Sequence, residues 1–178
     1  VMHRRHHSFA DTPKDPHSPV HLKNIISFNL ATVNEYRKLV NEFLKGGRTI
    51  SDAPRWYTLE WFAESVWTRV AFIILYFLFY VQFATSTWQF FLFPLHIFMG
   101  SMHGFIVNWF GHKTGYRNFD SMPDNSKNTL PLDFLMMGEL YQNNHHRRPK
   151  EPNFAVRWFE LDFGYIATLA LKRLRVIH

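Results

Sequence analysis

The chain has 178 residues, with 20 lysines and arginines, 14 aspartates and glutamates, 11 histidines and no cysteine. This length suits one domain or part of one. The absence of cysteine excludes a disulfide scaffold, a thiolate zinc site, a cysteine-ligated iron–sulfur cluster and a cysteine nucleophile. The mean hydropathy is slightly negative, as in soluble proteins. The charges are unevenly distributed, however, because residues 70–110 contain no aspartate, glutamate, lysine or arginine.

The region before this uncharged stretch predicts two helical segments. Residues 1–21 are polar and contain three prolines, which indicates a short helical start followed by a loop. Apolar residues recur at helical spacing over residues 22–45, which predicts an amphipathic helix that ends at the glycine pair 46–47. Tryptophan and tyrosine side chains then gather between residues 56 and 67, as is typical of the headgroup level of a membrane.

The uncharged stretch itself is long enough for two membrane-spanning helices of about 20 residues each. Its most polar part, residues 84–89, predicts the break between them. We therefore expect helices near residues 70–83 and 90–109. The alternative is a long buried helical hairpin of a soluble protein.

Two spans return the chain to the side of the membrane that it left. All 20 bases then lie on one side, in the flanks 1–69 and 111–178, which is the pattern of cytoplasmic segments. The sequence predicts a single all-α domain over residues 1–178: a membrane-spanning helical hairpin, residues 70–110, with a cytoplasmic helical cap. Within the second flank we expect a loop to about residue 131, a helix around residues 132–146 and a proline-containing turn. Apolar and basic residues then alternate irregularly over residues 154–177. Lipid headgroups, acidic substrates or an acidic partner account for the basic surplus without nucleic acid.

Two histidine runs flank the hairpin, HRRHH near the start and QNNHH near the end. Histidines at i, i+3 and i+4 of the first run share one face of a helix. Another histidine follows Asn108 by four residues, at the cytoplasmic end of the second span. The hairpin topology predicts that six histidines converge: His3, His6, His7, His112, His145 and His146.

Imidazole-rich sites suit iron, copper, zinc and nickel. Six histidines exceed what one metal ordinarily takes, so the sequence favours two metals in a cytoplasmic cap. The alternative for each run alone is a basic surface patch.

Three segments carry a family resemblance: HRRHHSFADTPKDPHSP, NWFGHKTGYRNFD and GELYQNNHHRRP. They resemble the second histidine box, the fourth-helix histidine segment and the third histidine box of the membrane acyl-CoA desaturases, the stearoyl-CoA delta-9 type and its bacterial relatives. The resemblance extends over nearly the whole chain. It implies an oxygen-dependent oxidoreductase that uses two irons (Fe²⁺/Fe³⁺), dioxygen and two electrons to insert a cis double bond into a saturated acyl chain.

The resemblance also implies roles for individual positions. Asn108 matches the asparagine that holds a metal-bound water. The metal ligands of the family match His3, His6, His7, His112, His145 and His146.

Two departures from the family pattern affect the expected site. Gln142 stands where the animal enzymes have the first histidine of the third box, and it could either ligate through its carbonyl oxygen or support a ligand. The first histidine box, HxxxxH, does not occur in the chain before HRRHH. We therefore expect that an N-terminal part of a longer protein is missing, and that residues 1–178 alone hold fewer than two irons and are inactive.

Other polar residues are weaker candidates. Five could accept a hydrogen bond from a ligating imidazole or otherwise support a ligand: Asp11, Asp15, His17, Asp120 and Glu139. A loop-stabilising role is the alternative for His17. Five bases flank the ligands and could attract a coenzyme A phosphate or an acidic electron donor: Arg4, Arg5, Arg147, Arg148 and Lys150. Membrane-surface charge is the alternative for these bases.

The resemblance further implies partners and a location. The substrate would be a fatty acyl thioester or acyl lipid, and the electron donor a small protein of the cytochrome b5, ferredoxin or rubredoxin type. We expect a multi-pass protein of a bacterial inner membrane with a cytoplasmic metal site. The alternative functions are a membrane di-iron hydroxylase and a non-catalytic metal-binding or transport protein, although transport sites usually lie near the bilayer midplane.

Overall fold

The computed structural model describes residues 1–15, 18–45, 55–130 and 133–177. These residues are helical apart from loops and two isolated β-bridges that join Tyr116, Asn128 and Tyr141. The predicted all-α class is therefore confirmed for the described residues. The chain divides into two compact units, Val1–Asn41 with His103–His178, and Glu42–Met102. The glycine pair predicted to end the second helix, residues 46–47, lies outside the described residues.

The first unit contains the N-terminal helices and the part of the chain that follows the predicted hairpin. Helix α1 (Met2–Phe9) is followed by a loop and by α2 (Ile25–Lys45), close to the predicted bounds. The Asn24 carboxamide accepts a hydrogen bond from the Ser27 N–H at 2.9 Å and so stabilises the start of α2. Phe28 is buried, and its ring lies 5.4 Å from that of Phe105 on α5 (Leu92–Lys113). This aromatic contact packs α2 against α5.

The later part of this unit contains three shorter helices, α6 (Asp133–Met136), α7 (Gln142–Arg147) and α8 (Phe163–Arg173). The continuous helix predicted over residues 132–146 is wrong. The chain turns between α6 and α7 because Met137 and Gly138 both have positive φ, 58° and 98°. A positive φ cannot continue an α-helix, and glycine adopts it without strain.

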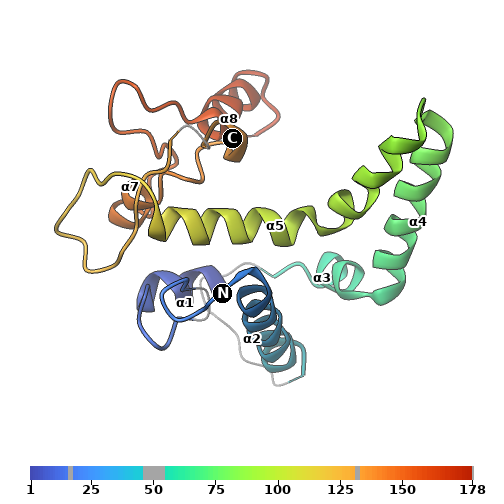
Figure 1. Ribbon diagram of the computed structural model, residues 1–178, viewed down its shortest axis with the longest axis horizontal. Helices are drawn as coiled ribbons and strands as arrows, with labels where there is room; N and C mark the ends of the chain where they lie inside the picture. The colour runs from blue at the N-terminus through green and yellow to red at the C-terminus, as the bar shows by residue number, and fades with distance from the viewer. Residues whose placement is uncertain (16–17, 46–54, 131–132, 178) are drawn as a thin grey trace. The chain divides into compact units, whose positions relative to one another are not determined.

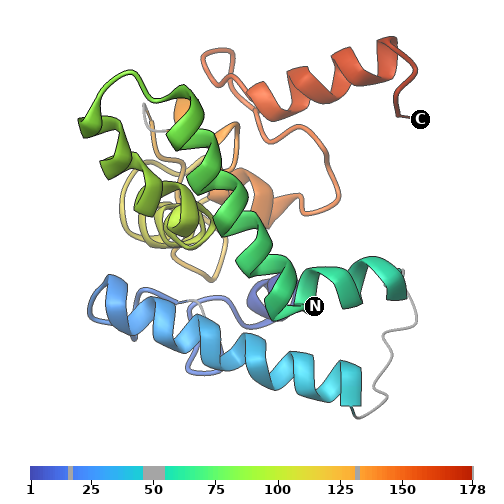
Figure 2. The same ribbon diagram turned by 90° about the vertical axis from the view of Figure 1, so that its right-hand side faces the viewer.

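The second unit contains α3 (Tyr57–Glu64), α4 (Val66–Phe83), the 3₁₀-helix η1 (Thr87–Phe91) and the first half of α5. The chain bends at Ser65 between α3 and α4 (Figure 1 and Figure 2). The hairpin turn lies within the predicted break at residues 84–89. Ser86 and Gln89 form a capping box there, which stabilises the start of η1. α4 begins four residues earlier than predicted, and α5 continues four residues further.

The two helices of this hairpin contact each other through aromatic and polar side chains. The rings of Phe77 and Phe93 lie 5.8 Å apart. The Tyr80 hydroxyl lies 3.1 Å from His96 Nδ1, and the His96 ring stacks on Tyr76 at 5.2 Å. His96 is thus hydrogen-bonded within the apolar hairpin.

Two segments of the described chain, Val66–Phe83 and Thr87–Lys113, are long and apolar enough to cross a membrane. Only 6% of the most apolar window of each is buried, whereas a core helix of a soluble protein is mostly buried. Length and composition alone agree with the predicted hairpin of two spans.

A network around Glu160 holds α7 against its surrounding loops. The buried Glu160 carboxylate accepts five hydrogen bonds, from the Tyr116 hydroxyl, Asn118 Nδ2, Asn144 Nδ2 and the Val156 and Arg157 N–H groups. The Asn143 carboxamide oxygen of α7 accepts two more from the backbone, at 2.8 Å each. Buried polar groups are costly unless paired, so this network of hydrogen bonds determines the position of α7.

Replacing Glu160 by alanine should therefore destabilise the protein strongly. The buried Asn144 amide would lose an acceptor at about 1–3 kcal/mol, and the four part-buried hydrogen bonds would each add a smaller cost. Tyr116→Phe removes only one of these donors and should cost about 1 kcal/mol. Thermal unfolding of both variants in detergent tests this expectation. A Glu160→Ala protein that melts like Tyr116→Phe would show that the network does not determine the position of α7.

A close contact between α5 and α7 generates a second prediction. A Cβ atom on the buried Gly111 would lie 2.4 Å from Gln142 Cγ and 3.1 Å from its Cβ. Gly111→Ala should push α7 away from α5 and cost about 1–3 kcal/mol. Gly100 lies on the same helix with no described atom within 4 Å of its would-be Cβ. Gly100→Ala should be neutral or stabilising, because alanine favours helix over glycine. Equal melting temperatures for the two variants would contradict the contact.

Candidate metal centre

The three histidines of α1 lie on one side of the helix, as their spacing predicts. His3 and His7 are one turn apart, and their Nε2 atoms lie 3.0 Å from each other. His145, from α7, brings its Nε2 within 3.2 Å of His3 and 2.9 Å of His7. We call these three residues the outer triad. Metal–imidazole bonds of about 2.1 Å place neighbouring nitrogens about 3.0–3.4 Å apart, so the three nitrogens are spaced for one metal ion.

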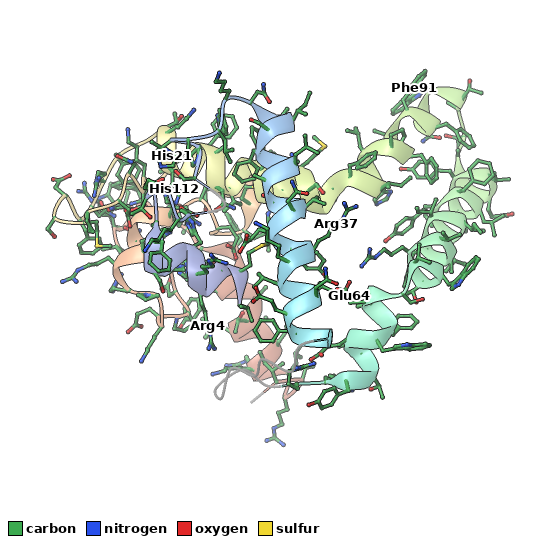
Figure 3. All side chains as sticks on the ribbon, turned by 90° about the horizontal axis from the view of Figure 1, so that it is seen from below. Arg4, His21, Arg37, Glu64, Phe91 and His112 are labelled. Atoms are coloured by element: carbon green, nitrogen blue, oxygen red, sulfur yellow. The ribbon has the colours of Figure 1, made fainter. Side chains whose placement is uncertain are left out.

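A second group of three imidazoles comes from three separate segments. His6 of α1, His112 of α5 and His146 of α7 offer ring nitrogens within 4.8 Å of one another. Their ring centroids lie 4.9–5.1 Å apart, and all three side chains are buried. We call these residues the inner triad. His112 lies at the end of α5 that carries this group (Figure 3).

The two triads are adjacent. The His7 ring of the outer triad lies 4.4 Å from the His146 ring of the inner triad, and 5.8 Å from the His6 ring. The structure thus gathers the six predicted histidines as two neighbouring groups of three. Two metal ions would fit this arrangement.

Each imidazole of the inner triad has a carboxylate oxygen 2.9 Å from its Nδ1: the pairs are His6–Asp15, His112–Asp11 and His146–Asp124. A carboxylate in this position makes Nδ1 the protonated nitrogen and leaves Nε2 free to ligate. The Nε2 atoms of His112 and His146 are buried and have no hydrogen-bond partner among the described residues. An unpaired buried polar atom costs about 1–3 kcal/mol, and a bound metal would satisfy it. The donor set therefore fits a metal ion.

The electrostatics of the site favour neutral imidazoles. Burial, together with the neighbouring imidazoles, lowers the pKa of His7 to about 2 and that of His145 to about 3. Burial alone would raise the pKa of Asp11, but the hydrogen bond from His112 lowers it to about 2. At neutral pH the imidazoles of His7 and His145 are thus uncharged and the Asp11 carboxylate is ionised, which are the protonation states that metal binding requires.

Asn108 and Gln142, which the sequence singled out, lie close to inner-triad histidines in the chain, but each donates its side-chain hydrogen bond to a nearby backbone carbonyl. Asn108 Nδ2 donates to the Gly104 carbonyl oxygen, one turn earlier on α5, at 2.8 Å. Gln142 is buried, and its Nε2 donates to the Glu139 carbonyl oxygen at 2.6 Å. Their expected roles, holding a metal-bound water and ligating or supporting a metal, remain predictions.

The predicted supporting residues have different surroundings. Asp11 and Asp15 bond to inner-triad imidazoles as described above. Asp120 has a side chain that is 93% exposed and lies 4.0 Å from Arg117 Nε. The exposed Glu139 hydrogen-bonds to no triad imidazole among the described residues. His17 lies outside the described residues.

The flanking bases lie on the surface of the first unit. Arg5 pairs with Glu35 of α2. The Arg148 guanidinium lies 6.0 Å from the Phe119 ring. Arg4, Arg147 and Lys150 are exposed as well. Figure 3 shows Arg4 on α1, on the side away from His112.

Asp124 and Glu160 are the two residues that sequence reasoning missed. Asp124 lies in the long loop between α5 and α6, and Glu160 precedes α8, so neither has a helical spacing from a histidine. The run PDNS around Asp124 indicates a turn and offers an acid close to the third histidine box, but no pattern pairs it with His146.

Comparison with known proteins agrees with this site. A model of the fatty acid desaturase family matches residues 1–172. The hex-5-enoyl-(acyl-carrier protein) acetylenase of Moorena producens is 26% identical over 99% of this chain and 58% of its own length. The delta-9 desaturase-like 4 protein of Arabidopsis thaliana is 26% identical over 92% of this chain and 52% of its own length. The sn-1 stearoyl-lipid 9-desaturase of Anabaena variabilis is 25% identical over 96% of this chain and 59% of its own length.

The chain thus spans between 52% and 59% of the length of these curated relatives. No solved structure matches the chain. The family model nevertheless covers all six histidines of both triads. The protein is a member of the membrane-associated fatty acid desaturase family.

Proposed function

We propose that the chain is part of a fatty acyl desaturase of the delta-9 type, which introduces a cis double bond into a saturated acyl chain. The observation that carries the proposal is the pair of adjacent imidazole triads in a chain of this family. An unactivated methylene offers no acidic proton, so acid–base side chains alone cannot remove its hydrogen. Two iron ions, when bound, would supply the dioxygen and electron-transfer chemistry that this step needs.

The residues of this chain would hold and orient those ions. The outer triad and the inner triad would each contribute three neutral imidazoles. Aspartates would hold the inner imidazoles in the tautomer that presents Nε2. Gln142 would add a ligand or a supporting hydrogen bond, and Asn108 would hold a water of the site. Imidazole also suits other metals, so iron is proposed from the family and from the chemistry of the reaction.

We propose an integral membrane location with the metal centre on the cytoplasmic side, in a bacterial inner membrane. The two long apolar helices and the location of all lysines and arginines outside residues 70–110 support a multi-pass arrangement. A site near the membrane surface can meet both an acyl chain and a soluble electron donor. The exposed bases Arg4, Arg147 and Lys150 would favour a small acidic redox protein, of the cytochrome b5, ferredoxin or rubredoxin type.

Three kinds of acyl carrier are compatible with this proposal: coenzyme A, an acyl-carrier protein and a membrane lipid. The three histidine segments resemble acyl-CoA desaturases, whereas the cyanobacterial relative is named for a stearoyl lipid and the acetylenase for an acyl-carrier protein. All of these substrates share a long acyl chain. Expression of the full-length protein, followed by separate analysis of acyl thioesters and membrane lipids, would identify the pool in which the double bond first appears. A hydroxylated chain in place of an unsaturated one would contradict the desaturase assignment.

Loss of one proposed ligand should abolish product formation. His6→Ala and His146→Ala in the full-length protein each remove an inner-triad imidazole and leave the apolar hairpin unchanged. We expect no detectable unsaturated product with normal membrane insertion, measured by gas chromatography of fatty acids and by membrane fractionation. His21 is an exposed histidine outside both triads, and its Nε2 lies 3.3 Å from the backbone oxygen of Asp11. His21→Ala leaves the Asp11 carboxylate in place, so it is the control and should retain activity. Normal product from either triad variant would refute the ligand assignment.

Asn108→Ala should severely reduce product, because the proposed metal-bound water would lose its holder. Asn29 provides a matched control, since its carboxamide also donates to a carbonyl oxygen one turn earlier in its own helix, at 2.9 Å. Asn29→Ala removes the same kind of bond far along the chain from either histidine run and should leave product yield unchanged. If the two variants were equally active, Asn108 would be removed from the site while the triads would stand.

A further inference from the structure

We propose that the two metal positions are unequal: the inner triad holds its metal ion more tightly than the outer triad, and Asp124 is a positioning residue for the tighter site. This inference rests on the proposed metal centre. It does not depend on the acyl substrate or on the position of the double bond.

Burial distinguishes the two triads. The inner-triad residues His6, His112 and His146 are 1%, 2% and 7% exposed. In the outer triad, His145 is also 7% exposed, but His7 is half-buried and His3 is exposed. A ligand packed on all sides loses little conformational freedom when a metal binds, whereas an exposed imidazole must be ordered first. The inner triad is the better preorganised of the two.

Support by carboxylates also differs between the triads. All three inner imidazoles bond to aspartate through Nδ1, but no carboxylate among the described residues bonds to an imidazole of the outer triad. His145 Nδ1 is buried and has no partner in the described part of the chain. Such supporting contacts typically change metal affinity 10–100-fold each. Three contacts on one side and none described on the other predict a large difference in affinity.

The aspartates of the inner triad are themselves held in place. Asp11 accepts from the Asn125 N–H at 2.7 Å and from the Ser18 hydroxyl at 2.9 Å. Asp124 accepts from the Ser126 N–H at 3.0 Å and from the Ser126 hydroxyl. Because their oxygens are already oriented, these carboxylates hold the imidazole rings in one rotamer. Their negative charges also favour a divalent cation nearby, in a buried setting where screening is weak.

Titration of the metal-free, purified full-length protein with Co²⁺ alone, in detergent, tests the inference. Optical absorption and calorimetry should resolve one tight equivalent and a second at least about 10-fold weaker. His112→Ala should remove the tight equivalent, and His3→Ala the weak one. Asp124→Asn should weaken the tight equivalent about 10–100-fold and leave the weak one unchanged.

Asp120 lies in the same loop with a side chain that is 93% exposed, so Asp120→Asn is the matched control and should change neither equivalent. If Asp124→Asn does not fold, Ser126→Ala loosens the same carboxylate without removing it and should weaken the tight equivalent by a smaller factor.

Two equal sites, or an Asp124→Asn effect confined to the weaker site, would overturn the inequality while leaving the metal centre in place. A folded wild-type protein that binds no Co²⁺ would overturn the metal centre itself, and the proposed function with it.

Discussion

Three buried hydrogen bonds between aspartates and imidazoles form the constraint on which the first unit depends. The bond from His112 to Asp11 joins residues 101 positions apart, and that from His146 to Asp124 joins α7 to the loop that follows α5. Removing polar groups from water is costly unless each finds a partner, so the segments must meet in one arrangement that pairs them. That arrangement leaves the Nε2 atoms on the side where a metal would bind.

A metal centre of this kind trades folding stability for chemistry. Six imidazoles packed within a few ångströms cannot all be charged, and burial with mutual repulsion keeps those of His7 and His145 neutral well below physiological pH. Neutral but unpaired nitrogens remain costly in the metal-free chain. The Glu160 network and the close contact of Gly111 with Gln142 position α7 independently of any metal. The scaffold can therefore hold α7 in place before a metal arrives.

Much of the fold could be predicted from the sequence because its signals are local. Helical spacing placed His3, His6 and His7 on one face, and an uncharged stretch interrupted by ATSTWQ marked the hairpin and its turn. The helix predicted over residues 132–146 failed at Met137 and Gly138, because the turn there depends on the surroundings. A Cβ at Gly138 would meet the Asp162 carboxylate at 2.4 Å. Asp162 lies in another part of the chain, so no local sequence pattern predicts this contact.

The same distinction explains which site residues escaped prediction. Ligands on one helix can be recognised in the sequence by their spacing. A carboxylate that supports an imidazole can come from any loop, because only the folded structure places its oxygen 2.9 Å from the imidazole Nδ1. Asp11 and Asp15 lie close to the first histidine run and were therefore candidates from the sequence. Asp124 is 22 positions from His146, and Asp120 is only four positions further from it. Sequence distance alone cannot choose between two acids of one loop. Burial does choose: the loop buries Asp124, fixed by Ser126, and leaves Asp120 in solvent.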